Sequence, residues 1–178
     1  MTVTVNMEVL FEEDGVSVEL PVRPEHDPYL DKEAGVVRFV TMDEYPMEYE
    51  FPEGVSFIQG NSNYLHYEND PDQWIADHAN DHLYAVGVYE HGAIQYSLAG
   101  ESFHSNDPWD YAVAAAIAIP DDYTDPKEAA RAILDEYTSY CNGAVYIVWE
   151  VDINTGDYDC CGGYYGWNQA EQILKEGF

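Results

Sequence analysis

Two histidines of the sequence have a spacing that could hold a metal ion. His78 and His82 lie four residues apart, so a helix would place both imidazoles on one side, together with Asp77 and Asp81. The glutamate of the zinc-protease motif is missing between them, and no third ligand is evident. We therefore predict surface histidines and no metal site.

The segment at residues 152–157, DINTGD, is similar to the start of a calcium-binding loop. Such a loop needs a late bidentate glutamate, which is missing here. The segment also lies between two expected strands, where Asn154-Thr155-Gly156 reads as a turn. We predict a hairpin turn and expect no cofactor.

Cys160 and Cys161 could supply a nucleophilic thiolate, with His91 or His104 as the base. No recognised local signature surrounds them, and a strongly negative surface raises the pKa of a thiol. We predict instead that both cysteines pack in a sheet beside a tight turn at Gly162-Gly163. No catalytic residue is assigned, and an enzyme that uses these groups is the third-ranked hypothesis.

Net charge limits the function of the chain more than any motif. The 178 residues include 35 acidic and 6 basic side chains, for a formal charge of −29. Duplex DNA carries one charge per roughly 1.7 Å, so 29 phosphates span about 50 Å, while a compact domain of this length measures about 40 Å across. A surface with DNA-like charge repels nucleic acid and attracts basic grooves. The expected partner is a basic nucleic-acid-binding host protein, such as a nuclease or CRISPR effector, and no nucleic acid is expected to bind directly.

Carboxylates gather in four stretches, and the second of these interleaves them with tyrosines in an exposed segment. Surplus aromatic side chains are typical of contact surfaces. The predicted partner-binding residues are Glu12, Glu13 and Asp14; Asp43, Glu44, Tyr45, Glu48, Tyr49, Glu50 and Glu53; Asp70, Asp72, Asp77 and Asp81; and Asp121, Asp122 and Asp125.

Two simpler explanations of the charge stay open, namely adaptation to a salt-rich cytoplasm and ordinary solubility. The 16 tyrosines and four tryptophans argue mildly against salt adaptation, because they suggest contact area beyond the needs of a core. The first residues, MTVTVNMEVLFEED, lack the basic and apolar regions of a secretion signal. With an odd set of three cysteines, the chain is expected in a reducing cytoplasm. A homodimer is an open alternative.

Alternation of apolar and polar residues predicts an N-terminal β-hairpin, with strands over residues 3–11 and 16–22 around a turn at 12–15. Residues 23–34 are predicted as a loop. The other expected strands are 35–41, 83–89, 93–98, 111–119, 144–151 and 157–161, and the expected helices are 70–81, 125–142 and 168–175.

The helix over residues 125–142 has the clearest signals, with Asp125 as N-cap, Pro126 at the first position and Asn142-Gly143 at the end. The strand over 111–119 carries alanines on one face, and we expect this helix to approach that face closely. The order of elements predicts an α+β fold, a largely antiparallel sheet with an N-terminal β-hairpin and two or three helices packed on it. We expect a single domain over 1–178, with a candidate N-terminal β subdomain over 1–60.

Four segments in the second half resemble, in the same order, motifs of a known group of proteins. They are VYEHGAIQYS at 88–97, NDPWDYAVAAAIAI at 106–119, LDEYTSYCNGAVYIV at 134–148 and DYDCCGGYYGW at 157–167. These segments resemble a family of uncharacterised acidic proteins carried by bacteriophages and conjugative plasmids. The resemblance covers roughly residues 83–178, and Cys161-Gly162 stand where the family more often has Cys-Trp.

The resemblance implies a mobile-element origin and brings no established activity. Small acidic proteins of such elements often block restriction or CRISPR enzymes by imitating DNA, which is an analogy at the level of origin. The leading hypothesis is therefore a non-enzymatic DNA mimic that occupies the nucleic-acid-binding groove of a host defence protein. The alternatives are a phage or plasmid structural or regulatory protein that acts through an aromatic patch, and a salt-adapted acidic domain.

Overall fold

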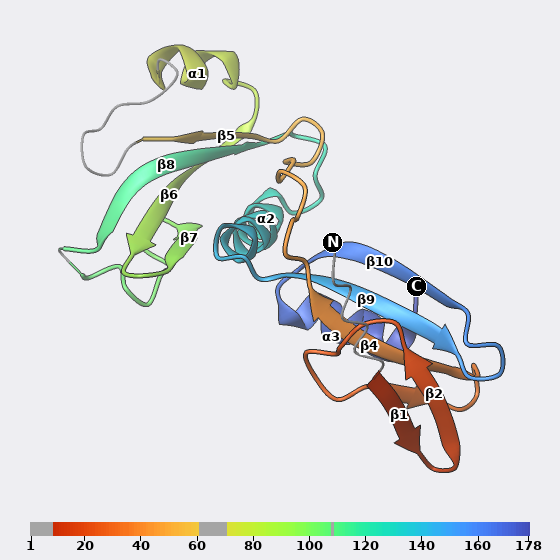
Figure 1. Cartoon of the computed structure of the whole chain (residues 1–178). Helices are drawn as coiled ribbons and strands as arrows, with labels where there is room; N and C mark the ends of the chain where they lie inside the picture. The colour runs from red at the N-terminus through yellow and green to blue at the C-terminus, as the bar shows by residue number, and fades with distance from the viewer. Residues whose placement is uncertain (1–8, 61–70, 108) are drawn as a thin grey trace, which may run out of the picture. The chain divides into compact units, whose positions relative to one another are not determined.

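The computed structural model describes residues 9–60, 71–107 and 109–178, and within them it shows three helices and ten strands in antiparallel sheets (Figure 1). The predicted α+β fold with an N-terminal hairpin is confirmed. The chain divides into two compact units, Met1–Met47 with Gly143–Phe178, and Glu48–Asn142. The first unit thus combines both ends of the chain, a division different from a β subdomain ending at residue 60. That the chain behaves as a single domain stays a prediction.

The first unit begins with the hairpin of β1 (Val9–Glu13) and β2 (Val16–Leu20). Asp14 and Gly15 form its turn with φ values of 51° and 82°, as a two-residue type I′ turn requires. Phe11 and Val18 face each other across the strands and are buried. The alternation predicted for residues 3–8 lies outside the described residues.

The main sheet of this unit has the order β10-β9-β4-β3, and all its neighbours are antiparallel. Its strands are β3 (Tyr29–Asp31), β4 (Val36–Met42), β9 (Val145–Asp152) and β10 (Tyr158–Tyr165). The three-residue β3 lies in the segment predicted as a loop, and it is too short to show an alternating pattern.

Both faces of this sheet bury apolar side chains, because β4 alternates between two cores (Figure 1). Val37 and Phe39 pack with Phe11 and Leu20 of the hairpin. On the other face, Val40 packs against α3 (Trp167–Glu176). Arg38 lies on that same face by alternation and is buried.

The second unit contains the sheet β5-β8-β6-β7. Its strands are β5 (Ser56–Gln59), β6 (His82–Glu90), β7 (Ile94–Leu98) and β8 (Tyr111–Ile119), and its helices are α1 (Pro71–Asp77) and α2 (Pro126–Cys141). The four-residue β5 had no prediction. The N-cap of α2 is as predicted, since the Asp125 carboxylate accepts a hydrogen bond from the Glu128 N–H at 3.1 Å.

The prediction that α2 approaches the alanine face of β8 is wrong. Ala130, Ile133 and Leu134 of α2 belong to the core that contains Ile117 and Ile119 of β8. The alanine face instead receives α1, whose Trp74 packs with Ala118 and Ile58. The branched residues of β8 form a continuous apolar surface with Val86 and Val88 of β6, so burying the larger helix on that face removes more apolar area from water.

The prediction for the cysteines is also wrong. Cys160 and Cys161 are exposed on β10, an edge strand of its sheet. The strand continues through Gly162 and Gly163 with a register shift, so these glycines form a bulge inside the strand in place of a tight turn. Cys141, the third cysteine, is exposed as well.

Candidate partner-binding surface

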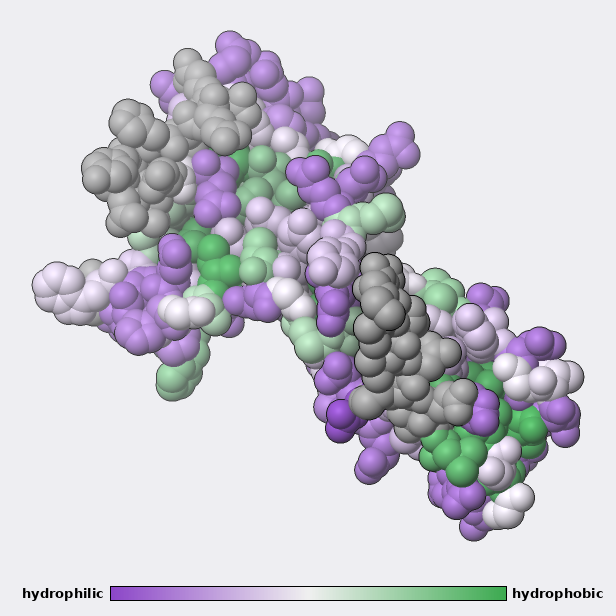
Figure 2. All heavy atoms as spheres, in the orientation of Figure 1, coloured by the Kyte–Doolittle hydropathy of each residue, from purple (hydrophilic) through white to green (hydrophobic). Residues whose placement is uncertain are grey.

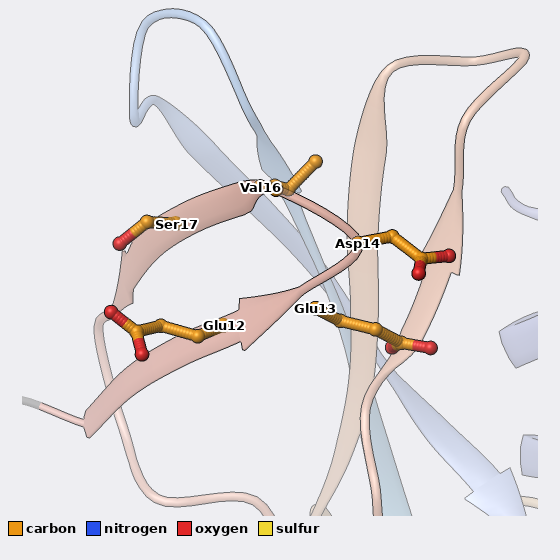
Figure 3. A pocket seen from close by; sticks show the side chains of 6 residues that line it. Glu12, Glu13, Asp14, Val16 and Ser17 are labelled. Atoms are coloured by element: carbon orange, nitrogen blue, oxygen red, sulfur yellow. The ribbon is translucent and has the colours of Figure 1, made fainter.

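The hairpin turn presents the first predicted carboxylate cluster, beside an open hollow of about 340 Å³ (Figure 3). Glu12 and Ser17 point to one side of the hairpin, and Glu13 and Asp14 to the other. All three carboxylates are exposed. Lys32 Nζ lies 2.7 Å from Asp14 Oδ2. The hydrogen bond from Lys32 is the larger cause of the lowered pKa of the Asp14 carboxyl, and the positive charge of Lys32 is the smaller cause.

The outward side of the hairpin carries an acidic residue that the sequence prediction missed. Phe11 and Val18 face the core, so by alternation Leu10, Glu12, Ser17 and Glu19 face outward. Glu12 pairs with Ser17, and Glu19 stands two residues further along the partner strand, on the same side. We call Glu12, Glu13 and Glu19 the hairpin carboxylates. The same alternation that predicted the hairpin could have placed Glu19 there.

The second predicted cluster is divided between the two units, because Asp43 to Tyr45 belong to the first and Glu48 to Glu53 to the second. Glu44, Glu48, Glu50 and Glu53 are exposed, Asp43 is half-buried, and Tyr45 is 88% exposed.

The prediction of Tyr49 as an exposed contact residue is wrong, because its side chain is only 8% exposed. Its ring contacts those of Phe51, Tyr137 and Tyr140, with centroids 5.1–5.7 Å apart, and its hydroxyl donates to Glu136 at 3.3 Å. Tyr49 therefore serves the core of the second unit.

The α1 cluster is smaller than predicted. Asp70 lies outside the described residues, Asp72 and Asp77 are exposed, and Asp81 is half-buried. The Asp77 carboxylate accepts a hydrogen bond from Gln73 at 2.6 Å. Helix α1 ends at Asp77, so His78 and His82 do not share a helical turn.

The fourth cluster serves the fold in part. Asp121, Asp122 and Asp125 are exposed, but Asp121 lies 3.0 Å from the His82 imidazole and Asp125 caps α2. Among the described residues, Asp122 of this cluster has no hydrogen bond or ion pair of its side chain.

Replacing Asp125, the N-cap of α2, should show how much the cap stabilises the fold. We expect Asp125→Ala to lower the free energy of unfolding by about 1 kcal/mol, because the Glu128 N–H loses its acceptor. Urea unfolding followed by circular dichroism measures the loss. Asp122→Ala, the exposed neighbour, should stay within about 0.5 kcal/mol of the wild type, and equal losses in both variants would contradict a capping role.

Nearly all cations of the chain are held by its own carboxylates. Within the described ranges, five of the six lysines and arginines are ion-paired: Lys32, Arg38, Lys127, Arg131 and Lys175. Arg38 is the buried one and bridges Asp31 at 3.0 Å and Glu150 at 2.7 Å. Few unpaired positive charges are therefore left in the described ranges to repel an approaching basic surface.

Each unit is strongly acidic by itself. The first carries 17 acidic and 4 basic residues, a difference of −13, and the second carries 18 and 2, a difference of −16. Hydrophilic residues are spread over both units on the face drawn in Figure 2. The charge is thus a property of both units and not of one acidic tail.

A group of aromatic and histidine side chains, exposed or half-buried, lies at the end of β6 and the start of β8. His91 Nδ1 lies 2.7 Å from Asp110 Oδ2, and the rings of Tyr89 and His104 stack with centroids 3.9 Å apart. Phe103 and Trp109 of the same loop region are 94% and 91% exposed. This aromatic patch brings together two of the segments on which the resemblance rests, those with His91 and with Trp109-Asp110.

A polar pocket of about 210 Å³ lies where α2 meets the outer edge of β7. Thr138 of α2 and Asn142, the C-cap of this helix, accept hydrogen bonds from the N–H groups of Tyr96 and Ile94 at 3.0 Å, which fixes the helix against the strand. One turn earlier, the helix contributes Asp135 and Arg131 to the pocket. We call this the α2–β7 pocket.

Arg131 closes one side of the pocket. Its guanidinium donates twice to Glu101, both at 2.8 Å, and once to Glu128 at 2.9 Å. Lys127 also contacts Glu101, at 2.9 Å. Hydrogen bonds from these two cations lower the pKa of the Glu101 carboxyl to about 2.

The depressed pKa of Glu101 makes its stabilising effect dependent on pH. Ionised Glu101 is favoured in the folded protein, so its contribution is complete above its usual pKa of 4.5 and is lost as pH falls towards about 2. We expect Glu101→Gln to lower the urea midpoint at pH 7, with a difference from the wild type that shrinks in this acid range. A difference that does not change with pH would contradict this role.

No candidate metal centre appears in the described ranges. They contain no group of three or more histidine, cysteine or carboxylate side chains placed to hold a metal ion. His91 and His104, the candidate bases for a cysteine nucleophile, interact with Asp110 and with Tyr89. Among the described residues, no helix is long and apolar enough to cross a membrane.

Comparisons with family models, with curated proteins and with solved structures find no match to the chain. The resemblance to acidic phage and plasmid proteins therefore stays a prediction.

Proposed function

We propose that the protein is an acidic DNA mimic, which inhibits a basic nucleic-acid-binding host protein by occupying its groove. The observation that carries this proposal is the surplus of exposed carboxylates on both units together with the internal pairing of almost all cations. A field of this sign speeds association with a basic groove and excludes nucleic acid. The proposed location is the host cytoplasm, and a restriction or CRISPR nuclease is the proposed class of target.

The hairpin carboxylates are the strongest candidates for direct contact with the target. They lie at an exposed end of the first unit, and none of the three has an ion-pair partner among the described residues. Glu12 and Glu19 lie diagonally across the two strands on the outward side of the hairpin, and Glu13 points to the other side next to the turn.

Capture from a host lysate tests the proposal. The immobilised protein is loaded at low salt and eluted with a salt gradient, and each bound protein is then identified. We expect a nucleic-acid-binding protein whose affinity falls at least about tenfold as ionic strength rises, because screening weakens contacts between exposed charges. A partner that stays bound at high salt and does not bind nucleic acid would contradict the proposal.

The aromatic patch supports a second function, that of a phage or plasmid structural or regulatory interaction protein. Phe103 and Trp109 expose far more apolar surface than side chains of a core, and exposed aromatics of this kind dominate many interfaces. This alternative predicts binding that persists at high salt and is lost in Trp109→Ala. In that case the charge would serve solubility.

A further inference from the structure

The α2–β7 pocket contains a carboxylate that no cation satisfies. The charged groups around the pocket are Glu101, Glu128, Asp135, Lys127 and Arg131. Both cations are engaged by Glu101 and Glu128. Within the described part of the chain, Asp135 has no hydrogen-bond or ion-pair partner for its carboxylate, so it carries the surplus negative charge of the site.

The surroundings of Asp135 favour an incoming cation. The side chain of Asp135 is in contact with solvent at the surface. Its partial burial, as the larger cause, and the negative charge of Glu128, as the smaller one, raise the pKa of its carboxyl. A positive group bound beside Asp135 would offset the free-energy cost of ionising this carboxyl. Asp135 therefore has more to gain from a cation than a fully solvated carboxylate has.

An aromatic side chain of the pocket also favours a cation. Phe103 lies in the lining and is 94% exposed, and an aromatic face attracts cations. The volume of about 210 Å³ is enough for the polar end of a long side chain.

We propose that the α2–β7 pocket receives an arginine side chain of the basic partner, with its guanidinium on Asp135 and its plane against Phe103. Arginine fits better than lysine because its planar fork pairs with a carboxylate and stacks on an aromatic ring. The inference rests on the proposed function, since it names one contact that would fix a basic partner in register.

Carboxyl-carbon NMR of the full chain tests this assignment with N-acetyl-arginine-N-methylamide as the probe, at about 0.15 M salt. We expect the probe to lower the pKa of Asp135 in a saturable manner and to leave that of Asp122 unchanged. The matched neutral probe, N-acetyl-citrulline-N-methylamide, should have no effect. Asp135→Asn should weaken binding of the arginine probe by about fivefold, whereas Asp122→Asn should not.

Equal responses of Asp135 and Asp122 to the probe, or unchanged probe affinity in Asp135→Asn, would overturn the assignment. Asp135→Asn keeps the shape of the side chain and removes an unfavourable charge, so the variant should fold. This outcome differs from failure of DNA mimicry. If the protein binds the arginine probe at Asp135 but captures no nucleic-acid-binding partner, the pocket assignment is supported and DNA mimicry is contradicted.

Discussion

Replacing Arg38 with methionine is expected to lower the free energy of unfolding by about 3 kcal/mol, the largest loss from any single change proposed for this protein. Arg38 is 5% exposed and is the shared partner of Asp31 and Glu150. Without the guanidinium, two carboxylates face each other in the first unit with no cation between them. The unfolding midpoint should fall by about 6–12 °C.

Thermal and urea unfolding of matched variants measure this effect. Lys32→Met removes an exposed ion pair with Asp14 and should lower the unfolding midpoint far less than Arg38→Met does. Adding Asp31→Asn and Glu150→Gln to Arg38→Met should recover part of the loss, because the unpaired charges disappear. Equal losses in Arg38→Met and Lys32→Met, or no recovery in the triple variant, would show that Arg38 has no such bridging role.

Reversing the hairpin carboxylates is expected to weaken binding of the captured partner by about a hundredfold. The variant carries Glu12→Lys, Glu13→Lys and Glu19→Lys. Each exposed charge contact contributes about 0.2–1 kcal/mol, and reversal replaces attraction with repulsion of similar size. Three positions together change the binding free energy by about 3 kcal/mol, where each 1.4 kcal/mol is tenfold.

The control for this variant keeps the same total charge. It reverses Glu25, Asp27 and Asp157, three exposed carboxylates of the same unit outside the hairpin. Calorimetric titration of both variants into the partner separates local arrangement from net charge. If the control loses as much affinity as the hairpin variant, the partner senses only the overall field and the hairpin has no special part.

Elements with strong local signals were predictable from the sequence. Asp125 and Pro126 define the start of α2, and Asp14-Gly15 defines the hairpin, because caps and two-residue turns depend on a few neighbouring residues. The short strands β3 and β5 were missed, since three or four residues show no period. Their place in the sheets comes from pairing with distant strands.

The packing of β8 was not predictable from its own pattern. A register shift between Val86 and Gly87 makes Ala114 an extra residue in β8, so a single alternation does not describe the whole strand. Gly87 is also required by packing, because a side chain there would overlap the Tyr111 ring. The face of β8 on which α2 packs depends on apolar residues of β6, which are far from β8 and α2 in the sequence.

The candidate surface was predictable in its charge but not in its arrangement. Tyr49 sits among carboxylates in the sequence, which suggested exposure, yet Tyr137 and Tyr140 of α2 bury its ring. Likewise, no sequence pattern indicated that Arg38 would be buried near Gly177, where an added Cβ atom would lie 2.9 Å from the guanidinium. The burial of Tyr49 and of Arg38 depends on contacts with segments that are distant in the sequence.

Displacement of duplex DNA from the captured partner tests the central claim most directly. A fluorescently labelled duplex is bound to the partner, the full-length protein is added, and anisotropy reports the free duplex. We expect complete displacement, with an apparent affinity that weakens in proportion to added duplex, because both ligands compete for one groove. A ternary complex, in which the protein binds while the duplex stays bound, would contradict DNA mimicry.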